Sequence, residues 1–356
     1  MKNLFSCIFM YLVHINFAFT QSPPAHIVIV ILENKSYSEI VGNPQAPYIN
    51  SLLSNSHTAL LTKSYAVTHP SQPNYLMLFS GSNQGVTNDN LPSNLPFTAL
   101  NLGATLIKKG LSFTGYSEDL PSVGSTVVAS GSYVRKHNPW VNWQGSGTNG
   151  IPAASNVPFS NFPTNYNLLP TLSIVVPNLD NDMHDGSIAA GDAWINTHLN
   201  GYIQWCITNN SLFILTFDED DGSASNHILT FFTGKDIIGG SYSQSITHYN
   251  VLRTLEELYQ LTYAGASATS SAITGIWLSL QSANYTFTGN GNWNVPANWL
   301  NNLMPPATTS PGSKIMINNA AGGQCILNIS YTISPGTTLT VMPGKKMVVN
   351  GKLNIN

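Results

Sequence analysis

Acidic and amide side chains gather at three places in the sequence, each directly after a run of apolar residues. The three groups lie at residues 33–34, 177–185 and 218–222. The chain has only 16 acidic residues, and carboxylates that pack together without a counter-charge raise one another's pKa and repel. Hard oxygen ligands, with an amide or an imidazole beside them, suit a divalent cation. Solvated acidic loops that cap helices would explain any one group but explain the three together poorly. We therefore predict a divalent metal site, holding one or two ions of unspecified identity.

A serine that can act as a nucleophile lies at position 71, in the segment AVTHPSQPNYLMLFSG of residues 66–81. The apolar residues after it predict a helix over residues 74–79. A helix N-terminus offers backbone N–H groups and the positive end of the helix dipole, which stabilise an alkoxide and bind a phosphate oxygen. A bound metal would lower the pKa of the Ser71 hydroxyl further. Taken alone, Ser71 would be assigned as a helix N-cap, the commoner role. Beside the acidic groups it is predicted to be the nucleophile.

Three apolar runs precede the polar groups, at residues 26–32, 172–176 and 212–217. They contain β-branched residues and do not alternate with polar ones, which is typical of strands that are covered on both faces. Helices are predicted at residues 46–54, 74–79, 99–109, 189–209 and 249–259. The pattern predicts an α/β fold, an open sheet with helices on both faces. In such a sheet ligands bind outside the carboxyl ends of the strands, where the polar groups lie.

The composition changes to Ala, Ser, Thr and Gly around residues 262–284, which indicates a linker. Short alternating runs follow, separated by Pro-Gly, Asn-Gly or Gly-Gly turn signals. They lie at residues 314–317, 325–329, 338–341, 346–349 and 352–355. The spacing predicts a small all-β module that resembles a β-solenoid, and a small sandwich fits nearly as well. We predict a catalytic domain over residues 21–282 and a β-rich C-terminal module over residues 283–356.

Residues 1–20 have the features of a secretory signal peptide, with Lys2, an apolar run over residues 4–19 and Gln21 after it. A buried strand or a membrane anchor is the alternative. No later apolar stretch reaches the ~18 residues needed to cross a bilayer. We predict that the protein is secreted, periplasmic or at the cell surface.

Charge and cysteine content argue against two classes of protein. The net charge of −3 provides no general attraction for a nucleic-acid backbone. Of the three cysteines, Cys7 lies in the predicted signal peptide, and Cys206 and Cys325 lie in different predicted domains. We therefore predict neither a nucleic-acid partner nor a disulfide framework.

Seven motifs, in order along residues 25–262, resemble the phosphoesterase family. That family includes bacterial acid phosphatases and phospholipases C, within the alkaline phosphatase superfamily. The motifs are EN at 33–34, HPSQPNY at 69–75, FSGSNQG at 79–85, HNPW at 137–140, PNLDNDMHDG at 177–186, TFDEDDG at 216–222 and THYNVLRTLE at 247–256. No single motif is decisive, but seven in order make an accidental similarity very improbable.

The resemblance implies roles for the matching positions. Glu33 and Asn34, together with Asp218 and Glu219, look like the ligands of a metal that also contacts the nucleophile. Ser71, followed by Gln-Pro-Asn, looks like the superfamily's nucleophile segment.

Further histidines match the same motifs. Asp180 and His184, with His248 downstream, are similar to the superfamily's ligands for a second metal. In acid-phosphatase-like members the corresponding histidines instead bind the phosphate or the leaving group, and the sequence leaves both readings open. His69 and His137 are candidates for hydrogen bonds to phosphate oxygens, and with His184 they complete the predicted catalytic histidines.

Two other segments have weaker assignments. Asn226 precedes His227 where related phospholipases C often show an Asp-His pair, which argues against a metal role there. Arg135 and Lys136 supply rare positive charge beside a family-like motif, and they either steer an anionic substrate or form a solvated surface.

The resemblance and the residues together predict a secreted, metal-dependent phosphomonoesterase of the acid-phosphatase type, acting on a small phosphate ester through a phosphoserine. A phospholipase C or another phosphodiesterase is the alternative within the class. A sulfatase-like or phosphoglycerate-mutase-like relative would show a different nucleophile setting. A non-catalytic surface or adhesion protein is the alternative of another class, and the C-terminal module could contact glycan or the cell surface in either case.

Overall fold

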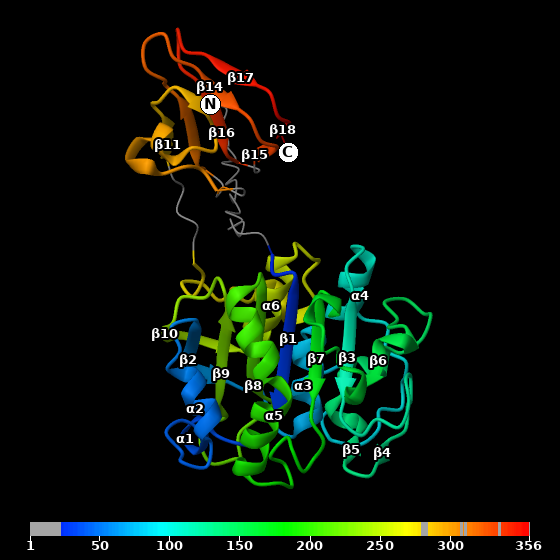
Figure 1. Cartoon of the computed structure of the whole chain (residues 1–356). Coiled ribbons are helices and arrows are strands. Elements are labelled where there is room, and N and C mark those ends of the chain that lie inside the picture. Colours follow the sequence, from blue (N-terminus) through cyan, green and yellow to red (C-terminus); the bar gives the residue numbers. More distant parts are fainter. Residues whose placement is uncertain (1–22, 279–283, 307–308, 310–311, 334–335, 356) are drawn as a thin grey trace, which may run out of the picture. The chain divides into compact units, whose positions relative to one another are not determined.

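The computed structural model describes residues 23–278, 284–306, 309, 312–333 and 336–355. The chain divides into two compact units, Pro23–Ser279 and Leu280–Asn356 (Figure 1). The predicted signal peptide, Cys7 and residues 279–283 of the predicted linker lie outside the described residues.

The first unit is built on an eight-stranded sheet in the order β10-β2-β9-β8-β1-β7-β3-β6 (Figure 1). Its strands are β1 (His26–Leu32), β2 (Thr58–Tyr65), β3 (Phe113–Ser117), β6 (Asn156–Pro158), β7 (Leu172–Val176), β8 (Ser211–Phe217), β9 (His227–Gly234) and β10 (Gly240–Thr247). β9 runs antiparallel to its neighbours β2 and β8, whereas the other pairs of the sheet are parallel. The three strands expected from the sequence are the adjacent β7, β1 and β8 at the centre of the sheet.

Helices cover both faces of this sheet, which confirms the predicted α/β class. They are α1 (Tyr37–Ile40), α2 (Pro47–Leu53), α3 (Ser71–Ser80), α4 (Leu102–Lys108), α5 (Ile188–Thr208) and α6 (His248–Leu258). Successive residues of a strand point to opposite faces. Val28, Val30 and Leu32 of β1 share one apolar core with residues of α2 and α5. α3 packs against α6 on the opposite face (Figure 1).

The carboxyl ends of the parallel strands lie along one edge of the sheet. The loops that leave this edge include residues 33–36 after β1, 66–70 after β2, 177–187 after β7 and 218–226 after β8. The long segment after β3 contains the hairpin of β4 (Ala129–Ser130) and β5 (Tyr133–Val134) and the short 3-10 helix η1 (Arg135–His137). The polar groups identified in the sequence therefore meet at one edge.

Residues 262–278, which the composition assigned to a linker, belong to the first unit. Ala264, Ile273 and Ile276 are fully buried. The backbone approaches α3 so closely that a Cβ atom on Gly81 would lie 2.0 Å from the carbonyl oxygen of Ala264. Small residues permit this close contact. The same small residues weaken the apolar pattern, which is why the sequence did not show that the segment belongs to the first unit.

The second unit consists of short parallel strands. They are β11 (Asn284–Phe287), β12 (Gly291–Asn292), β13 (Lys314–Ile317), β14 (Cys325–Leu327), β15 (Tyr331–Ile333), β16 (Thr338–Val341), β17 (Met347–Val349) and β18 (Leu353–Ile355). They form the ladders β11-β13-β16, β12-β14-β17 and β15-β18, in which every pair is parallel. Stacked parallel rungs are the pattern of a β-solenoid, whereas a sandwich is built from antiparallel strands. The core of this unit includes the buried Phe287, Trp293 and Trp299.

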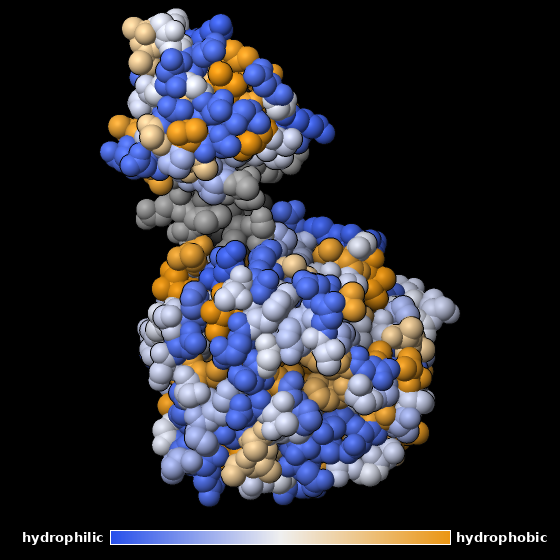
Figure 2. Space-filling model, viewed as in Figure 1, coloured by the Kyte–Doolittle hydropathy of each residue, from blue (hydrophilic) through white to orange (hydrophobic). Residues whose placement is uncertain are grey.

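On the drawn faces of the two units, apolar residues form small groups between polar ones (Figure 2). Among the helices in the described residues, none combines the length and the apolar character that crossing a bilayer requires.

Candidate active site

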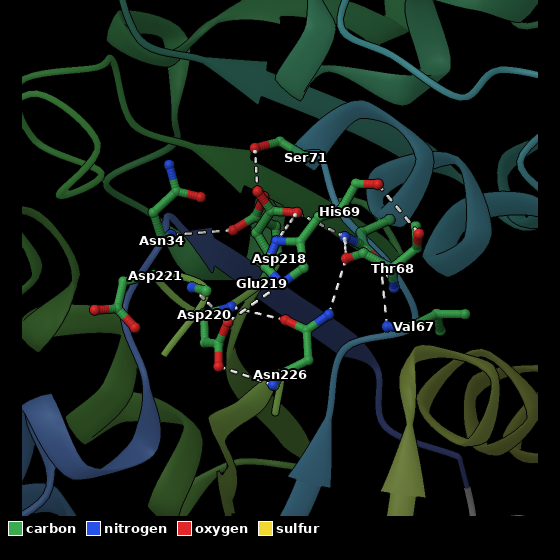
Figure 3. A network of polar contacts seen from close by, with 12 residues as sticks. Asn34, Val67, Thr68, His69, Ser71, Asp218, Glu219, Asp220, Asp221 and Asn226 are labelled. Carbon is green, nitrogen blue, oxygen red and sulfur yellow. Dashed lines mark hydrogen bonds and ion pairs between the residues drawn. The ribbon is translucent and has the colours of Figure 1, made fainter. Parts of the chain in front are cut away.

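The side chains that follow β1, β2 and β8 converge at the carboxyl edge of the sheet (Figure 3). Ser71, Asp218 and Glu219 point toward one another, with His69 beside Glu219. The two carboxylates and Ser71 are buried. Residues that are far apart in the sequence thus form one polar centre under the start of α3.

Ser71 lies between two carboxylates. It is the first residue of α3, and its Oγ atom lies 3.1 Å from Oε2 of Glu33 and 3.3 Å from Oε1 of Glu219. The helix begins three residues earlier than the sequence predicted. The serine therefore stands at the positive end of the helix dipole, with carboxylate oxygens ready to accept its proton.

Two further residues of α3 hold these carboxylates in place. The hydroxyl of Tyr75 donates a hydrogen bond to Oε1 of Glu33, and Nδ2 of Asn74 donates to Oε2 of Glu219 at 3.1 Å. Positions three and four residues after Ser71 lie on the same face of the helix as the serine. One helix face therefore supplies both the hydroxyl and the groups that orient its neighbours.

Glu33, His137 and Asp182 form a second, adjoining group. The ring of His137 places Nε2 at 3.3 Å from Oε1 of Glu33 and Nδ1 at 3.3 Å from Oδ2 of Asp182. It stacks on Tyr75 with the ring centroids 5.1 Å apart. All three residues are buried, and one ligand atom from each lies within 4.8 Å of the others. This spacing would allow the three side chains to share one metal ion.

Four carboxylates of the site are buried with little positive charge beside them. Burial, reinforced by the charges of Asp218 and Asp182, holds the pKa of Glu33 well above its usual range. Burial also raises the pKa of Asp182, Asp218 and Glu219 to about 7. In the described part of the chain, no Lys or Arg forms an ion pair with any of the four. The centre is therefore suited to binding a cation from outside the chain.

Several buried polar atoms in this centre make no hydrogen bond within the described residues. They are Oδ1 of Asn34, Nε2 of His137, Oδ2 of Asp182 and Oδ2 of Asp218. A buried polar atom without a partner costs roughly 1–3 kcal/mol. Carboxylate, amide and imidazole atoms are ligands that divalent metals take in proteins. The donor set therefore fits a metal ion.

His248 lies under the same edge, at the first position of α6. Its Nε2 atom is 3.0 Å from the carbonyl oxygen of Phe217, the residue before Asp218. A carbonyl oxygen can only accept, so Nε2 carries the ring proton and Nδ1 keeps a free lone pair. Nδ1 is buried and has no hydrogen-bond partner in the described residues, and burial lowers the pKa of His248 to about 4.

His69 is the half-exposed member of the site, with 44% of its side chain accessible. Its Nδ1 atom lies 3.2 Å from Oε2 of Glu219, and its Nε2 atom lies 3.3 Å from Oδ1 of Asp220. Because the ring faces both the carboxylates and solvent, it can contact an incoming substrate.

The structure separates Asp180 from the buried group that includes Asp182. Asp180 is exposed, and its Oδ2 accepts a hydrogen bond from Ser132 at 2.6 Å. His184 lies between the buried group and the exposed part of the loop. The centroid of its ring is 5.8 Å from that of His137. Its Nδ1 atom is hydrogen-bonded to Oδ1 of Asp185 at 2.6 Å. Of the two aspartates, Asp182 is the one whose carboxylate lies with the buried ligand atoms of Glu33 and His137.

Sequence reasoning passed over Asp182, Asn74 and Tyr75. The helical spacing of Asn74 and Tyr75 after Ser71 was a usable signal. No such signal distinguished Asp182 from Asp180, because both lie in one irregular loop.

Comparison with known proteins identifies similar sequences. The model of the phosphoesterase family matches residues 43–262. A phosphatidylinositol-3-phosphatase of Mycobacterium tuberculosis is 51% identical over 258 residues, covering 71% of this chain and 83% of the relative. An acid phosphatase of Aspergillus fumigatus is 30% identical over 255 residues, covering 66% of this chain and 55% of the relative. The chain therefore spans most of the mycobacterial relative but about half of the fungal one.

Among solved structures, a protein of the alkaline phosphatase superfamily from Vibrio parahaemolyticus superposes with a TM-score of 0.50. The two share 14% sequence identity, and the match covers 72% of each chain. At this identity the similarity concerns the fold alone.

Proposed function

The chain belongs to the phosphoesterase family, and from this premise and the site geometry we propose an exported, metal-dependent phosphomonoesterase of the acid-phosphatase type. The observation that carries the proposal is Ser71, whose hydroxyl lies between Glu33 and Glu219 in a buried centre that needs a cation. The named relatives are phosphatases, which supports a monoester as substrate.

Two overlapping groups of residues would hold the metal. Glu33, Asn34, Asp218 and Glu219 would hold the ion beside the nucleophile. A divalent cation there would lower the pKa of the serine hydroxyl and neutralise charge on the phosphate.

A second ion would use the adjoining group. Glu33, His137 and Asp182 offer three buried ligand atoms, and Glu33 is common to both groups. The free Nδ1 of His248 is a further donor at this edge.

Ser71 is proposed to attack phosphorus in line with the departing ester oxygen. The Oγ–P bond forms as the bond to the alcohol breaks, and the serine proton is directed toward Glu33 and Glu219. The alcohol leaves with the electron pair and takes a proton, for which the half-exposed His69 is placed. The positive end of the α3 dipole stabilises charge on the phosphoryl oxygens. Water then attacks the phosphoserine, which releases phosphate and restores the hydroxyl.

Two alternatives are weaker. A phosphodiesterase or phospholipase C would need room for a second ester group beside Ser71. A non-catalytic surface or adhesion protein would not need carboxylates gathered around a serine, and all five residues of this arrangement are present. Those residues are Glu33, Asn34, Ser71, Asp218 and Glu219.

The proposal is tested by removing metal and comparing substrates. The purified protein is treated with a chelator, its metal content is measured, and rates are determined on phenyl phosphate, bis(phenyl) phosphate and a phosphatidylcholine analogue. We expect activity to be lost on chelation, to return with a divalent ion and to be greatest on the monoester. Full turnover by metal-free protein would refute the metal role, and faster cleavage of a diester would refute the monoesterase assignment.

A further inference from the structure

A small pocket lies beside the start of α3, apart from the buried carboxylates. It has a volume of about 110 Å³. Residues 88–91 and the β4–β5 hairpin form its walls with α3. Its apolar lining is Leu91, Val128, Ala129 and Val134, and its polar lining is Gln72, Asp89, Arg135 and Lys136.

Hydrogen bonds from the residue after the nucleophile shape this pocket. The backbone N–H of Gln72 donates to Oδ1 of Asp89 at 3.0 Å. The side-chain amide of Gln72 donates to the carbonyl oxygens of Asn88 and Asn90 at 2.9 and 2.8 Å. Lys136 bonds Oδ2 of Asp89 at 2.8 Å. The pocket is therefore formed before any ligand arrives, which reduces the entropy lost on binding.

Two charged residues of the pocket lie close to the active site, because Asp89 and Lys136 act electrostatically on the carboxyl group of Glu219. Gln72 directly follows Ser71. Lys136 directly precedes His137, whose ring lies 3.3 Å from Oε1 of Glu33. A phosphate ester attacked by Ser71 would thus have the ion pair of Lys136 and Asp89, and the pocket that this pair lines, in its vicinity.

The apolar side of the pocket is open to solvent. Leu91 is 49% exposed and Val128 is 56% exposed. Single exposed apolar residues are normal, but two that line one preformed pocket beside a polar reaction centre favour an apolar ligand group. The pocket is smaller than the dry cavity of about 150 Å³ that takes up benzene, but it is open on its apolar side, so it suits a short alkyl segment or an aromatic ring that is only partly enclosed.

We propose that this pocket is a leaving-group subsite, which binds the apolar alcohol portion of a phosphate monoester while Lys136 faces the phosphate end. The inference rests on the proposed function and specifies its substrate class as monoesters of apolar alcohols. Lys136, which the sequence left between steering and solvation, becomes part of the substrate site.

The test compares two monoesters that differ in the polarity of the alcohol. Values of kcat/KM are measured on phenyl phosphate and glycerol phosphate for the wild type, Val128→Asn and Leu91→Asn. Leu168→Asn is the matched control, because Leu168 is 71% exposed in the same unit and does not line the pocket. Dividing the ratio of the two substrates in each variant by the same ratio in the wild type cancels the intrinsic reactivities of the two esters.

We expect each pocket variant to lose about tenfold or more on phenyl phosphate and less than about twofold on glycerol phosphate, as for a lost apolar contact in a specificity pocket. The control should keep the wild-type ratio. An unchanged ratio in both pocket variants, or an equal loss on both esters, would overturn the subsite. A wild type that hydrolyses neither monoester would instead overturn the proposed function, so the two failures are distinguishable.

Discussion

The two units of this protein bury very different groups. All 16 acidic residues and all nine histidines lie before residue 283, whereas four of the 13 basic residues lie after it. The first unit buries Glu33, Asp182 and Asp218 without a Lys or Arg partner among the described residues. The second unit is held together by aromatic and aliphatic residues such as Trp293. Burial of apolar area stabilises a fold, but uncompensated charge does so only when something else binds it. The contrast locates the chemistry in the first unit.

Replacing the nucleophile should give the largest effect. Ser71→Ala is expected to lower kcat on phenyl phosphate by about 1000-fold or more, because the covalent route needs the hydroxyl. Ser80→Ala is the control, since Ser80 is a buried serine of the same helix that bonds the carbonyl oxygen of Leu76. Steady-state rates and circular dichroism are measured on both variants. Near wild-type turnover by a folded Ser71→Ala protein would refute the nucleophile.

Two aspartates in the loop after β7 allow a buried carboxylate to be compared with an exposed one. We expect Asp182→Asn to weaken metal binding by about 10–100-fold, because Asp182 is buried against His137. Asp180→Asn should stay within about twofold, since an exposed carboxylate interacts weakly. Titration calorimetry with a divalent metal measures both. A larger loss of metal affinity from Asp180→Asn than from Asp182→Asn would show that Asp180 is the ligand, as the sequence resemblance implies.

Removal of the second unit should leave the chemistry nearly unchanged. Residues 21–282 contain every proposed site residue, so this fragment is expected to keep kcat on phenyl phosphate within about twofold. Trp293→Ala in the full chain is the companion variant, because it opens a cavity in the second core only. A fragment that folds by circular dichroism but loses most of its turnover number would show that the second unit contributes to the site.

Replacing Glu256, a buried residue of α6 outside the site, should have a smaller effect, on the pH dependence of stability. Burial raises the pKa of Glu256 to about 7, although Ser267 and the backbone of Ala264 donate to its carboxylate. A raised pKa in the folded state gives stability that is present in acid and lost as the pH rises through about 7. The difference in free energy of unfolding between wild type and Glu256→Gln should therefore fall by about 1–3 kcal/mol from about pH 5 to about pH 8.

Urea unfolding at both pH values measures this difference. Glu257→Gln is the matched control, since Glu257 forms a helical pair with Arg253 near the surface. The control variant shows how much the loss of a helical ion pair alone changes the free energy of unfolding, and such a pair contributes little. A flat difference for Glu256→Gln would show that its carboxylate is as well solvated in the folded state as in the unfolded chain.

The sequence was sufficient to predict the parts of the fold that a single strong signal, such as a continuous apolar run, indicates. The apolar runs of β1, β7 and β8 identified the centre of the sheet, and the polar residues after them identified the edge. β9 was not predicted, because Thr230 and Thr233 interrupt its apolar pattern; they are buried and satisfied by Ser64, Thr216 and Thr58 across the sheet. Edge strand β10 is largely exposed and so lacks an apolar run.

Within the site, regular spacing was informative and loop conformation was not. The placement of Ser71 at the start of a helix followed from the apolar run that comes after it in the sequence. The choice between Asp180 and Asp182 depended on how the loop after β7 turns, where Met183 has a positive φ of 79°. A side-chain position in an irregular loop has no periodicity from which to predict it.

The stereochemistry of hydrolysis tests the central claim most directly. The wild-type protein is given a phosphorothioate monoester that is chiral at phosphorus through two oxygen isotopes, in water enriched in the third isotope, and the configuration of the released thiophosphate is determined. Attack by Ser71 followed by attack of water makes two in-line displacements, each of which inverts the phosphorus. We predict net retention of configuration at phosphorus. Net inversion would mean that water attacks the ester directly, and it would contradict the role of Ser71 as nucleophile.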